Sequence, residues 1–326
     1  MSDSPRHTAR VTIITPTYNR ADLLPETIVS VLAQDYGDFE YLILDDGSTD
    51  DTVERVLKAQ TDPRIRWERH ANMGEARTVN KGFGLAQGEY VAVINSDDPV
   101  RPGWLRAMVD ALDAHPEALV AYPDFDMIDE TGRVVRHRPT HDYSYRDMIV
   151  WNSSQVGPGA LIRQRAIEQA GPRDPSLRYV SDYDLWLRIG LYGPLMRVPQ
   201  TLATWRTHAG GTSAQTQRSP AYAAEHIRVV AQIYARDDLP PEVLAYRREA
   251  LSRAYYRAGL MTMWTARWRS RRYFARAFLL YPSLTRSYPL LRRHPRDLLR
   301  MLLPAAVDKA LLRWWLRRRG IEPAEG

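Results

Sequence analysis

Short apolar runs alternate with segments of helical periodicity along the first hundred residues. Four apolar runs rich in β-branched residues predict strands, at residues 11–15, 39–44, 64–68 and 90–95. Three segments between or beside them carry apolar residues at helical spacing, at residues 22–34, 50–59 and 74–87. Strands that alternate with helices of this length form right-handed βαβ units. The pattern therefore predicts an α/β fold with a mostly parallel, mixed sheet and flanking helices.

A change of pattern divides the rest of the chain. Residues 120–199 mix strand-like and helix-like pieces, with a helix expected at about 182–190. After residue 213 the pattern becomes helical and is punctuated by prolines. A chain of 326 residues has the length of about two folding units. We therefore expect one domain over residues 1–213 and a helical extension over residues 214–326.

Composition narrows the possible chemistry. The chain contains no cysteine, which excludes disulfides, thiolate zinc sites, iron–sulfur clusters and cysteine nucleophiles. Its apolar stretches are too short to span a bilayer, and its polar first ten residues lack the apolar core of a secretory signal. We therefore expect a cytoplasmic location.

The net charge of +6 combines two regions of opposite sign. Residues 251–326 contain 17 Lys and Arg against four Asp and Glu, a net charge of +13. Subtracting these from the totals of 45 and 39 leaves 28 basic and 35 acidic residues in residues 1–250, a net charge of −7. An acidic body and a basic tail need separate explanations.

Polar residues gather where the predicted strands end. Thr15–Thr17, Asp45–Asp46 and Asn95–Asp98 each close an apolar run. The carboxyl ends of parallel strands share one edge of a sheet, and ligands bind beyond this edge. The sequence therefore predicts a ligand site formed by these three segments.

Asp97 and Asp98 favour a metal site. Two adjacent acids at a buried strand end repel each other, and a divalent cation neutralises them. Oxygen ligands with few protein contacts suit Mg2+ or Mn2+ held jointly by the protein and a diphosphate. The alternative is a polar turn before Pro99, in which Asp98 caps the next helix.

Asp45 and Asp46 favour nucleotide recognition. A carboxylate at a strand tip accepts hydrogen bonds from a nucleobase or a ribose. The alternative is an ordinary strand-to-helix turn in which Ser48, Thr49 or Asp50 caps the helix. Neither a GxxxxGK[ST] loop nor a GxGxxG fingerprint is present, which disfavours P-loop and Rossmann sites.

Two stretches resemble a known family. Residues 11–51, VTIITPTYNRADLLPETIVSVLAQDYGDFEYLILDDGSTDD, are similar to the opening of the family 2 glycosyltransferases, which have the GT-A fold. Residues 72–98, NMGEARTVNKGFGLAQGEYVAVINSDD, are similar to the donor-binding stretch of that family. The resemblance covers roughly residues 8–213. It implies a GT-A glycosyltransferase domain over residues 1–213, and the basic helical C-terminal extension over residues 214–326 lies outside the resemblance.

The resemblance implies an inverting, hexosyltransferase-type enzyme that depends on a nucleoside-diphosphate sugar. The nucleotide and donor site would include Thr15, Pro16, Thr17, Tyr18, Asp45, Asp46, Asn95 and Ser96. Asp97 would hold Mg2+ or Mn2+ through a DxD-type motif, in which Asn95 stands where many members carry the first Asp. Arg77 and Lys81, four residues apart on one predicted helix face, would lie near the donor. A solvated basic face is the alternative for these two cations.

Two later segments resemble the catalytic part of the family. Residues 181–188, SDYDLWLR, are similar to its acid–Asp motif and the helix that follows, with Ser181 where an acid is common. Carried over, Asp182 is the general base, because a sugar hydroxyl is a poor nucleophile. Residues 205–213, WRTHAGGTS, resemble the closing segment, in which His208 would contact the metal or the diphosphate and Arg206 would favour the leaving group. Helix capping is the alternative for Asp182, and a structural role is the alternative for His208.

The basic tail interleaves arginines with aromatic residues. If residues 307–319 form a helix, Val307, Leu311 and Trp314 share a face opposite Arg313. A basic amphipathic helix with tryptophan at its boundary suits an anionic membrane surface. Nucleic-acid binding fits the charge, but no nucleic-acid motif accompanies it. We therefore expect peripheral attachment to the inner face of the cell membrane and no nucleic-acid partner, with a packed helical extension as the alternative.

These features predict a glycosyltransferase that moves a sugar from a nucleoside-diphosphate sugar to a hydroxyl of a glycan or lipid-linked acceptor. The basic tail and the family resemblance favour a role in cell-surface polysaccharide or glycolipid assembly. The alternative is a non-catalytic sugar-nucleotide or glycan-binding relative of the same fold, favoured by Asn95 and Ser181.

Overall fold

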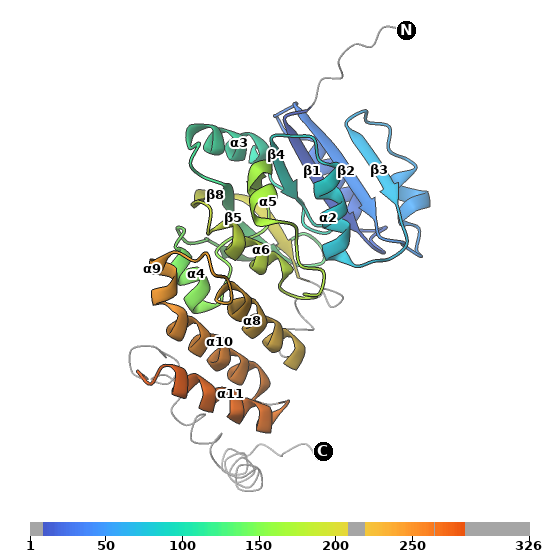
Figure 1. The fold of residues 1–326 in the computed structure, drawn as a ribbon. Helices are drawn as coiled ribbons and strands as arrows, with labels where there is room; N and C mark the ends of the chain where they lie inside the picture. Colours follow the sequence, from blue (N-terminus) through green and yellow to red (C-terminus); the bar gives the residue numbers. More distant parts are fainter. Residues whose placement is uncertain (1–8, 208–218, 264, 284–326) are drawn as a thin grey trace, which may run out of the picture. The chain divides into compact units, whose positions relative to one another are not determined.

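A computed structural model of the chain describes residues 9–207, 219–263 and 265–283 (Figure 1). The chain divides into two compact units. The first contains the described residues up to 207 apart from 150–152, and the second contains residues 150–152 and the described residues from 219 onward. Each unit is described by itself.

A mixed sheet of eight strands forms the centre of the first unit, in the order β3-β2-β1-β4-β7-β5-β6, with β8 paired to β5. Its parallel half contains β1 (Val11–Thr17), β2 (Phe39–Asp45), β3 (Ile65–Arg69) and β4 (Tyr90–Val93). The other half contains β5 (Val120–Ile128), β6 (Val134–Arg138), β7 (Leu161–Arg163) and β8 (Leu195–Arg206). Strand β7 runs antiparallel to β4 and β5, whereas β8 runs parallel to β5. The predicted mixed sheet is confirmed.

Helices cover both faces of this sheet (Figure 1). The helices that lie wholly in this unit are α1 (Leu24–Leu32), α2 (Glu75–Leu85), α3 (Trp104–Ala114), α5 (Gln164–Ala170) and α6 (Ser181–Ile189). Helix α4 (Tyr145–Trp151) ends in residues that belong to the second unit. On one face, Ile13 of β1 shares a buried cluster with Ile28 of α1 and Trp104 of α3. The next residue, Ile14, points to the opposite face because side chains alternate along a strand. There it packs against Gly82 of α2, where an added Cβ would lie 2.7 Å from Ile14, so only a glycine lets the helix come this close.

The segment predicted as a helix at residues 50–59 forms a short π-helix, η1 (Thr52–Leu57). The N–H of Lys58 donates to the carbonyl of Val53, five residues back, at 3.0 Å. Single π turns of this kind occur often at functional sites. The helix is therefore present but shorter and wider than predicted.

The strand register brings the predicted polar segments together. Thr17 of β1 lies opposite Asp45 of β2, and Asp45 lies opposite Arg69 of β3. On the other side of β1, the N–H of Ile94 donates to the carbonyl of Ile14 at 2.9 Å, so the turn after β4 begins beside β1. The carboxyl ends of β1, β2 and β4 therefore form one edge, as the sequence predicts.

The described part of the second unit is helical. It contains α8 (Pro220–Ile233), α9 (Pro241–Ala245), α10 (Arg247–Thr262) and α11 (Arg267–Leu280). Helices α10 and α11 pack closely, because Gly259 leaves room for the ring of Phe274. The carbonyl of Gly259 also accepts a hydrogen bond from Ser270 Oγ at 2.8 Å. The predicted C-terminal helices are confirmed here. The boundary predicted at residue 213 and the helix predicted at 307–319 lie outside the described residues.

Candidate functional site

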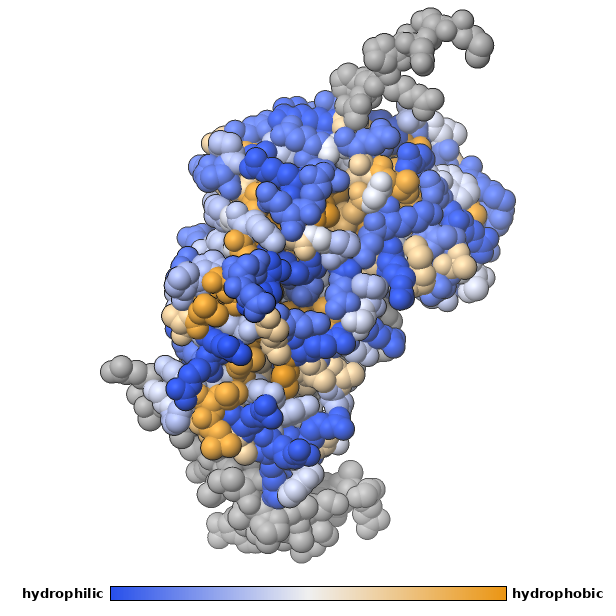
Figure 2. Space-filling model, viewed as in Figure 1, coloured by the Kyte–Doolittle hydropathy of each residue, from blue (hydrophilic) through white to orange (hydrophobic). Residues whose placement is uncertain are grey.

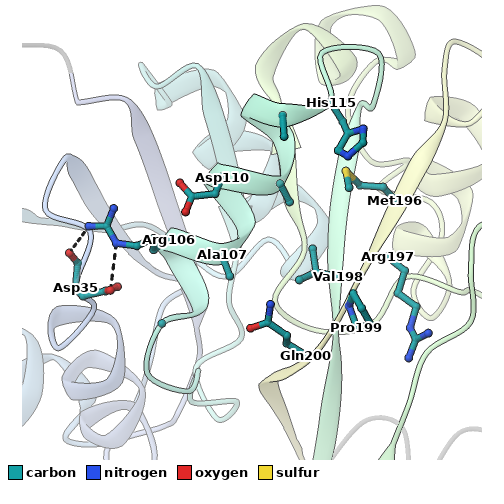
Figure 3. A pocket seen from close by; sticks show the side chains of 13 residues that line it. Asp35, Arg106, Ala107, Asp110, His115, Met196, Arg197, Val198, Pro199 and Gln200 are labelled. Atoms are coloured by element: carbon teal, nitrogen blue, oxygen red, sulfur yellow. Dashed lines mark hydrogen bonds and ion pairs between the residues drawn. The ribbon is translucent and has the colours of Figure 1, made fainter.

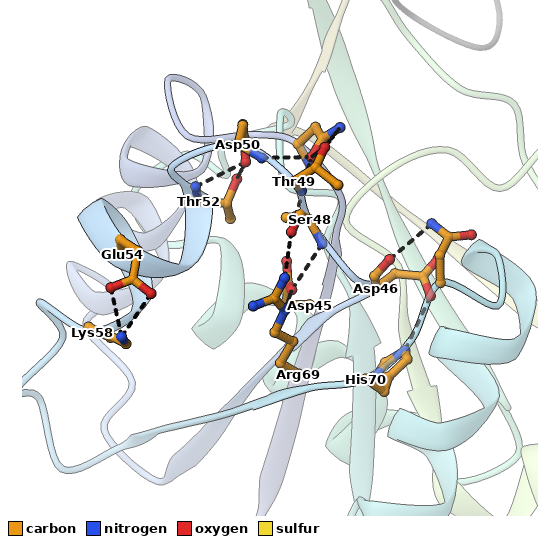
Figure 4. Close-up of polar contacts among 12 residues, drawn as sticks. Asp45, Asp46, Ser48, Thr49, Asp50, Thr52, Glu54, Lys58, Arg69 and His70 are labelled. Atoms are coloured by element: carbon orange, nitrogen blue, oxygen red, sulfur yellow. Dashed lines mark hydrogen bonds and ion pairs between the residues drawn. The ribbon is translucent and has the colours of Figure 1, made fainter.

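Asp45 ends β2 with a buried side chain at the carboxyl edge of the sheet (Figure 4). Its Oδ2 accepts a hydrogen bond from the N–H of Ser48 at 3.1 Å and lies 3.4 Å from Nε of Arg69. Within the described residues, its Oδ1 and the hydroxyl of its neighbour Thr17 are buried without a hydrogen-bond partner. A buried polar atom without a partner costs stability. Two such atoms on paired residues of neighbouring strands therefore mark a place that suits a polar ligand.

The other three residues of the predicted nucleotide-binding stretch are placed differently from Thr17. The hydroxyl of Thr15 shares a hydrogen bond of 3.0 Å with the hydroxyl of Tyr41 inside the protein. Pro16 is buried in β1, whereas the side chain of Tyr18 is 44% exposed. Thr15 and Pro16 therefore support the edge from inside, and Tyr18 is the member of the stretch that solvent reaches.

Asp46 is bonded to the segment that precedes α2. Its two carboxylate oxygens accept hydrogen bonds from the N–H groups of Met73 at 2.7 Å and Gly74 at 2.9 Å. Nε2 of His70 lies 3.3 Å from the same carboxylate, as Figure 4 shows. Free N–H groups at the start of a helix favour an anion. Both oxygens of Asp46 thus hold the segment before α2, and contact between Asp46 and the donor stays a prediction.

The two cations predicted on α2 both contact the protein. Nζ of Lys81 lies 2.9 Å from the carboxylate of Glu68 on β3. Arg77 is exposed and donates to the carbonyl of Met73 at 3.5 Å. Both side chains are thus on α2 as predicted, and their contact with a donor stays a prediction.

The turn after β4 points its two carboxylates in different directions. Asp98 is buried, and its oxygens accept hydrogen bonds from the N–H of Arg206 at 2.7 Å and from Nδ2 of Asn95 at 2.9 Å. Burial and the neighbouring charge of Asp97 raise the pKa of Asp98 to about 7. Asn95 therefore stabilises the turn through Asp98, and Ser96 is buried beside it.

Asp97 is the carboxylate of this turn that solvent reaches. Its side chain is 17% exposed, and its Oδ2 lies 3.6 Å from Nε of Arg20. No group of three or more His, Asp or Glu in the described part of the chain is placed to hold a metal. One accessible carboxylate instead fits Mg2+ or Mn2+ that takes its other ligands from a diphosphate and water. The predicted second ligand, His208, lies outside the described residues.

Arg206 is a structural residue. Its side chain is 1% exposed and forms an ion pair with Glu26 of α1. It also donates to the backbone carbonyls of Asp97 at 3.0 Å, Asp129 at 3.0 Å and Glu130 at 3.1 Å. The expectation that Arg206 acts on the leaving group is corrected, because its guanidinium is directed into the protein. It holds the turn after β4 in position.

Asp182 lies in the first turn of α6 and is exposed. Its Oδ1 accepts a hydrogen bond from the N–H of Tyr183 at 2.7 Å, which is compatible with the helix-capping alternative. Asp184, two residues on, is buried in an ion pair with Arg188 at 2.7 Å. Asp182 is therefore the acid of this turn that an acceptor can approach.

Contacts with α2 place the segment that leads into α6. Arg173 and Asn80 exchange two hydrogen bonds of 2.8 Å between the backbone of Arg173 and the amide of Asn80. The guanidinium of Arg173 also lies 3.1 Å from Glu75, the first residue of α2. These contacts bring residues just before α6 to the end of α2 that Asp46 holds. Asn80 lies within the family-like stretch 72–98 but was not singled out there, and Arg173 belongs to no recognisable motif, so sequence reasoning missed this contact.

Two arginines at the carboxyl edge were also missed from the sequence. Arg20 follows β1 and faces Asp97, and Arg69 ends β3 beside Asp45 with a side chain that is 51% exposed. The available signals were the position of Arg69 directly after a predicted strand and the position of Arg20 within the family-like stretch 11–51. Both place positive charge next to the carboxylates of the candidate site.

A separate cavity of about 550 Å³ lies between α3 and the first half of β8 (Figure 3). Its lining includes Asp110, His115, Met196 and Gln200. None of the predicted site residues lines it. The candidate site lies at the other end of β8, where Arg206 contacts Asp98, so this cavity is not part of it.

Comparison with known proteins identifies the family. Residues 12–171 match the model of glycosyl transferase family 2. An uncharacterized protein of Sinorhizobium fredii is 31% identical over 222 residues, which is 66% of this chain and 24% of that protein. Succinoglycan biosynthesis protein ExoO of Rhizobium meliloti is 40% identical over 129 residues, 39% of this chain and 36% of that protein. The matched segments therefore make up well under half of either relative.

Solved structures identify the fold. Residues 1–349 of S. aureus TarS superpose with a TM-score of 0.63 at 19% identity, over 88% of this chain and 87% of that one. The same fragment has also been solved with UDP-GlcNAc. Mannosyltransferase PcManGT of Pyrobaculum calidifontis, solved with GDP-Man and Mn2+, superposes with a TM-score of 0.58 at 20% identity, over 88% and 79%. The chain has the GT-A fold, and its residues 12–171 match glycosyl transferase family 2.

Proposed function

We propose that the protein is an inverting, hexosyltransferase-type glycosyltransferase that transfers a sugar from a nucleoside-diphosphate sugar to an acceptor hydroxyl. Family membership supports the reaction class. The observation that carries the donor site is the pair of buried atoms, Thr17 Oγ1 and Asp45 Oδ1, which have no partner among the described residues. The two residues are paired in the strand register at the edge that also carries Asp97. A base or ribose that donates to Asp45 would satisfy them once the half-exposed Arg69 turns aside.

Replacing Thr17 by Val tests this observation. The variant removes an unpartnered hydroxyl from a β-strand, so the free energy of unfolding should rise by about 1 kcal/mol. Binding of UDP or GDP should weaken about tenfold, because the hydrogen bond between the hydroxyl of Thr17 and the nucleotide is lost. Urea unfolding and calorimetric titration measure the two effects.

Thr12→Val is the matched control in the same strand. The hydroxyl of Thr12 is also buried, but it donates to Glu40 at 2.6 Å and accepts from the N–H of Gly88 at 3.0 Å. Its loss should lower the free energy of unfolding by about 1–3 kcal/mol and leave nucleotide binding unchanged. A Thr17→Val variant that behaves like Thr12→Val would contradict the proposed donor site.

The proposed chemistry assigns separate tasks to Asp97 and Asp182. Asp97 would hold Mg2+ or Mn2+, which supplies positive charge to the leaving diphosphate. The Mn2+ in the PcManGT structure supports this assignment. Asp182 accepts the proton of the acceptor hydroxyl while the oxygen of that hydroxyl forms a bond to the anomeric carbon. The bond from that carbon to the diphosphate breaks, and the diphosphate leaves with the electron pair.

A non-catalytic sugar-nucleotide-binding relative is the second candidate. It is favoured by Asn95, whose amide occupies the first acidic position of the motif and bonds to Asp98, and by Ser181 in the acid–Asp motif. Slow hydrolysis of a sugar nucleotide that requires Mg2+ or Mn2+ separates the two candidates. An enzyme of this class transfers the sugar to water at a low rate, whereas a binding protein leaves the donor intact.

Two observations support a class of acceptor: the named function of a relative and the basic character of the second unit. ExoO is a succinoglycan biosynthesis protein, which supports a polysaccharide or glycolipid acceptor. No described helix is both long and apolar enough to cross a membrane. Helix α11 contains five arginines and no acid. We therefore include an anionic membrane surface among the proposed partners.

The exposed residues of α11 support this surface. Trp268 and Leu279 are 72% and 79% exposed, and three exposed arginines lie between them, at positions 269, 272 and 276. Residues 268, 272, 275 and 279 fall on one helical stripe. Figure 2 shows apolar residues at the surface beside polar ones over the helical unit. Tryptophan with flanking arginines suits the boundary of an anionic bilayer.

The full chain should therefore bind vesicles of phosphatidylcholine and phosphatidylglycerol, and binding should fall as salt is added. Changing Arg269, Arg272 and Arg276 to Gln should weaken binding at least about tenfold, because each arginine contributes roughly 1 kcal/mol near such a surface. The control changes Arg133, Arg136 and Arg138, exposed on or beside β6, and removes the same charge. Equal weakening by both variants in a sedimentation assay, or equal binding to neutral vesicles, would reject α11 as the membrane surface.

A further inference from the structure

Arg20 lies in the loop after β1, where neighbouring contacts fix its backbone. Asn19 adopts a left-handed conformation with a φ of 53°, and its Oδ1 accepts a hydrogen bond from the N–H of Thr49 at 2.8 Å. The N–H of Asn19 donates to Ser48 Oγ at 2.9 Å, and that of Arg20 donates to Thr52 Oγ1 at 2.9 Å. A non-glycine residue in this conformation is strained and persists where its surroundings determine it. The protein itself therefore positions Arg20 at the carboxyl edge.

The guanidinium of Arg20 faces the carboxylate proposed to hold the metal. Its Nε lies 3.6 Å from Oδ2 of Asp97, and its Nη1 donates to the carbonyl of Asn19 at 3.2 Å. The two side chains are 27% and 17% exposed. An ion pair that solvent partly reaches is weak enough to be exchanged for a stronger partner. Arg20 therefore lies next to Asp97 but leaves its carboxylate partly exposed to solvent.

We propose that Arg20 is the counter-ion of Asp97 in the free protein and becomes a ligand of the donor diphosphate when a divalent cation takes the carboxylate. The inference rests on the proposed function and adds a residue to its donor site. A cation at Asp97 repels the guanidinium. Arginine binds phosphate oxygens through paired, charge-assisted hydrogen bonds. The diphosphate that brings in the cation thus also accepts the displaced arginine.

This exchange couples the binding of the cation to the binding of the nucleotide. A cation without a nucleotide has to displace Arg20 while the guanidinium gains no new anion. With a nucleoside diphosphate present, the same displacement forms new hydrogen bonds. Each ligand therefore raises the affinity of the other by the same factor. Arg20 increases this factor beyond what the direct contact between the cation and the diphosphate provides.

Arg20→Gln tests the exchange by titration with Mn2+ alone, with UDP or GDP alone, and with both together. Removing the competing charge should tighten Mn2+ binding in the absence of nucleotide about three- to fivefold. Nucleoside diphosphate binding in the presence of Mn2+ should weaken about tenfold, because charge-assisted bonds are lost. The cation and the nucleotide should then raise each other's affinity much less than in the wild type. Arg20→Lys keeps the positive charge, so its affinities for Mn2+ and for nucleoside diphosphates should lie between those of the wild type and of Arg20→Gln.

Arg106→Gln is the control, since it removes a half-exposed arginine that pairs with Asp35 away from the site. It should change none of the three titrations, and thermal unfolding confirms that each variant is folded. If Arg20→Gln leaves Mn2+ binding without nucleotide unchanged, or if neither protein binds Mn2+, the exchange is wrong. A protein that binds no nucleoside diphosphate would reject the proposed function instead, and the titration with Mn2+ alone would still decide whether Arg20 competes for Asp97.

Discussion

Asp97→Asn should lower the rate of sugar transfer about a hundred- to a thousandfold, because the site loses the carboxylate that carries the cation. Asp98 does not replace it, since its oxygens are bonded to the N–H of Arg206 and to the amide of Asn95. The variant should also lose the ability of Mn2+ to strengthen nucleotide binding. Transfer of radiolabelled sugar and hydrolysis of the donor measure the loss.

The fold should survive the Asp97→Asn change. It removes a partly exposed ion pair with Arg20 and also the repulsion between two adjacent carboxylates, and the two effects oppose each other. Asp110→Asn, an exposed acid on α3, is the control for the change of charge and should transfer at the normal rate. A folded Asp97→Asn variant with near-normal, Mn2+-dependent turnover would show that the cation binds elsewhere.

Asp182→Asn should lower kcat about a hundred- to ten-thousandfold while nucleotide binding stays unchanged, because the general base acts on the acceptor and not on the donor. The helix should remain intact, since an asparagine oxygen can also accept the N–H of Tyr183 that Asp182 now binds. The split between kcat and nucleotide affinity distinguishes this variant from Asp97→Asn.

Glu168→Gln removes an exposed acid on the neighbouring helix α5 and is the control, which should keep the normal kcat. Loss of nucleotide binding in Asp182→Asn, or an unchanged kcat, would return Asp182 to the helix-capping alternative.

The location of the candidate site was predictable because it depends on local patterns. Strands β1 to β4 have the apolar pattern and the composition that a parallel sheet requires, and each strand is followed by polar residues. All parallel strands end at one edge, so Thr17, Asp45 and Asn95–Asp98 meet without any knowledge of side-chain contacts. The same logic predicts a site but assigns no partner to any of its side chains.

Two acids with similar sequence contexts have different roles for a reason that only the fold supplies. Asp45 and Asp46 are adjacent, yet Asp45 Oδ1 lacks a partner in the described residues while both oxygens of Asp46 bond to N–H groups 27 and 28 residues later. Alternation along a strand sends neighbouring side chains to opposite faces. Which face then meets the start of α2 depends on how that helix packs, and no local pattern contains this information.

Sequence by itself determined the strands, the helices between them, the shared edge and the acids placed there, because periodicity and strand direction are properties of short segments. Tertiary structure alone decided which acids remain available. Arg206 became a buried support instead of a site residue because the end of β8 comes to lie beside the turn after β4, more than a hundred residues earlier. Arg20 lies beside Asp97 because the loop after β1 faces the same turn across the sheet edge. Contacts between distant segments fix the charge and exposure of each side chain, and these decide whether it binds the protein or a ligand.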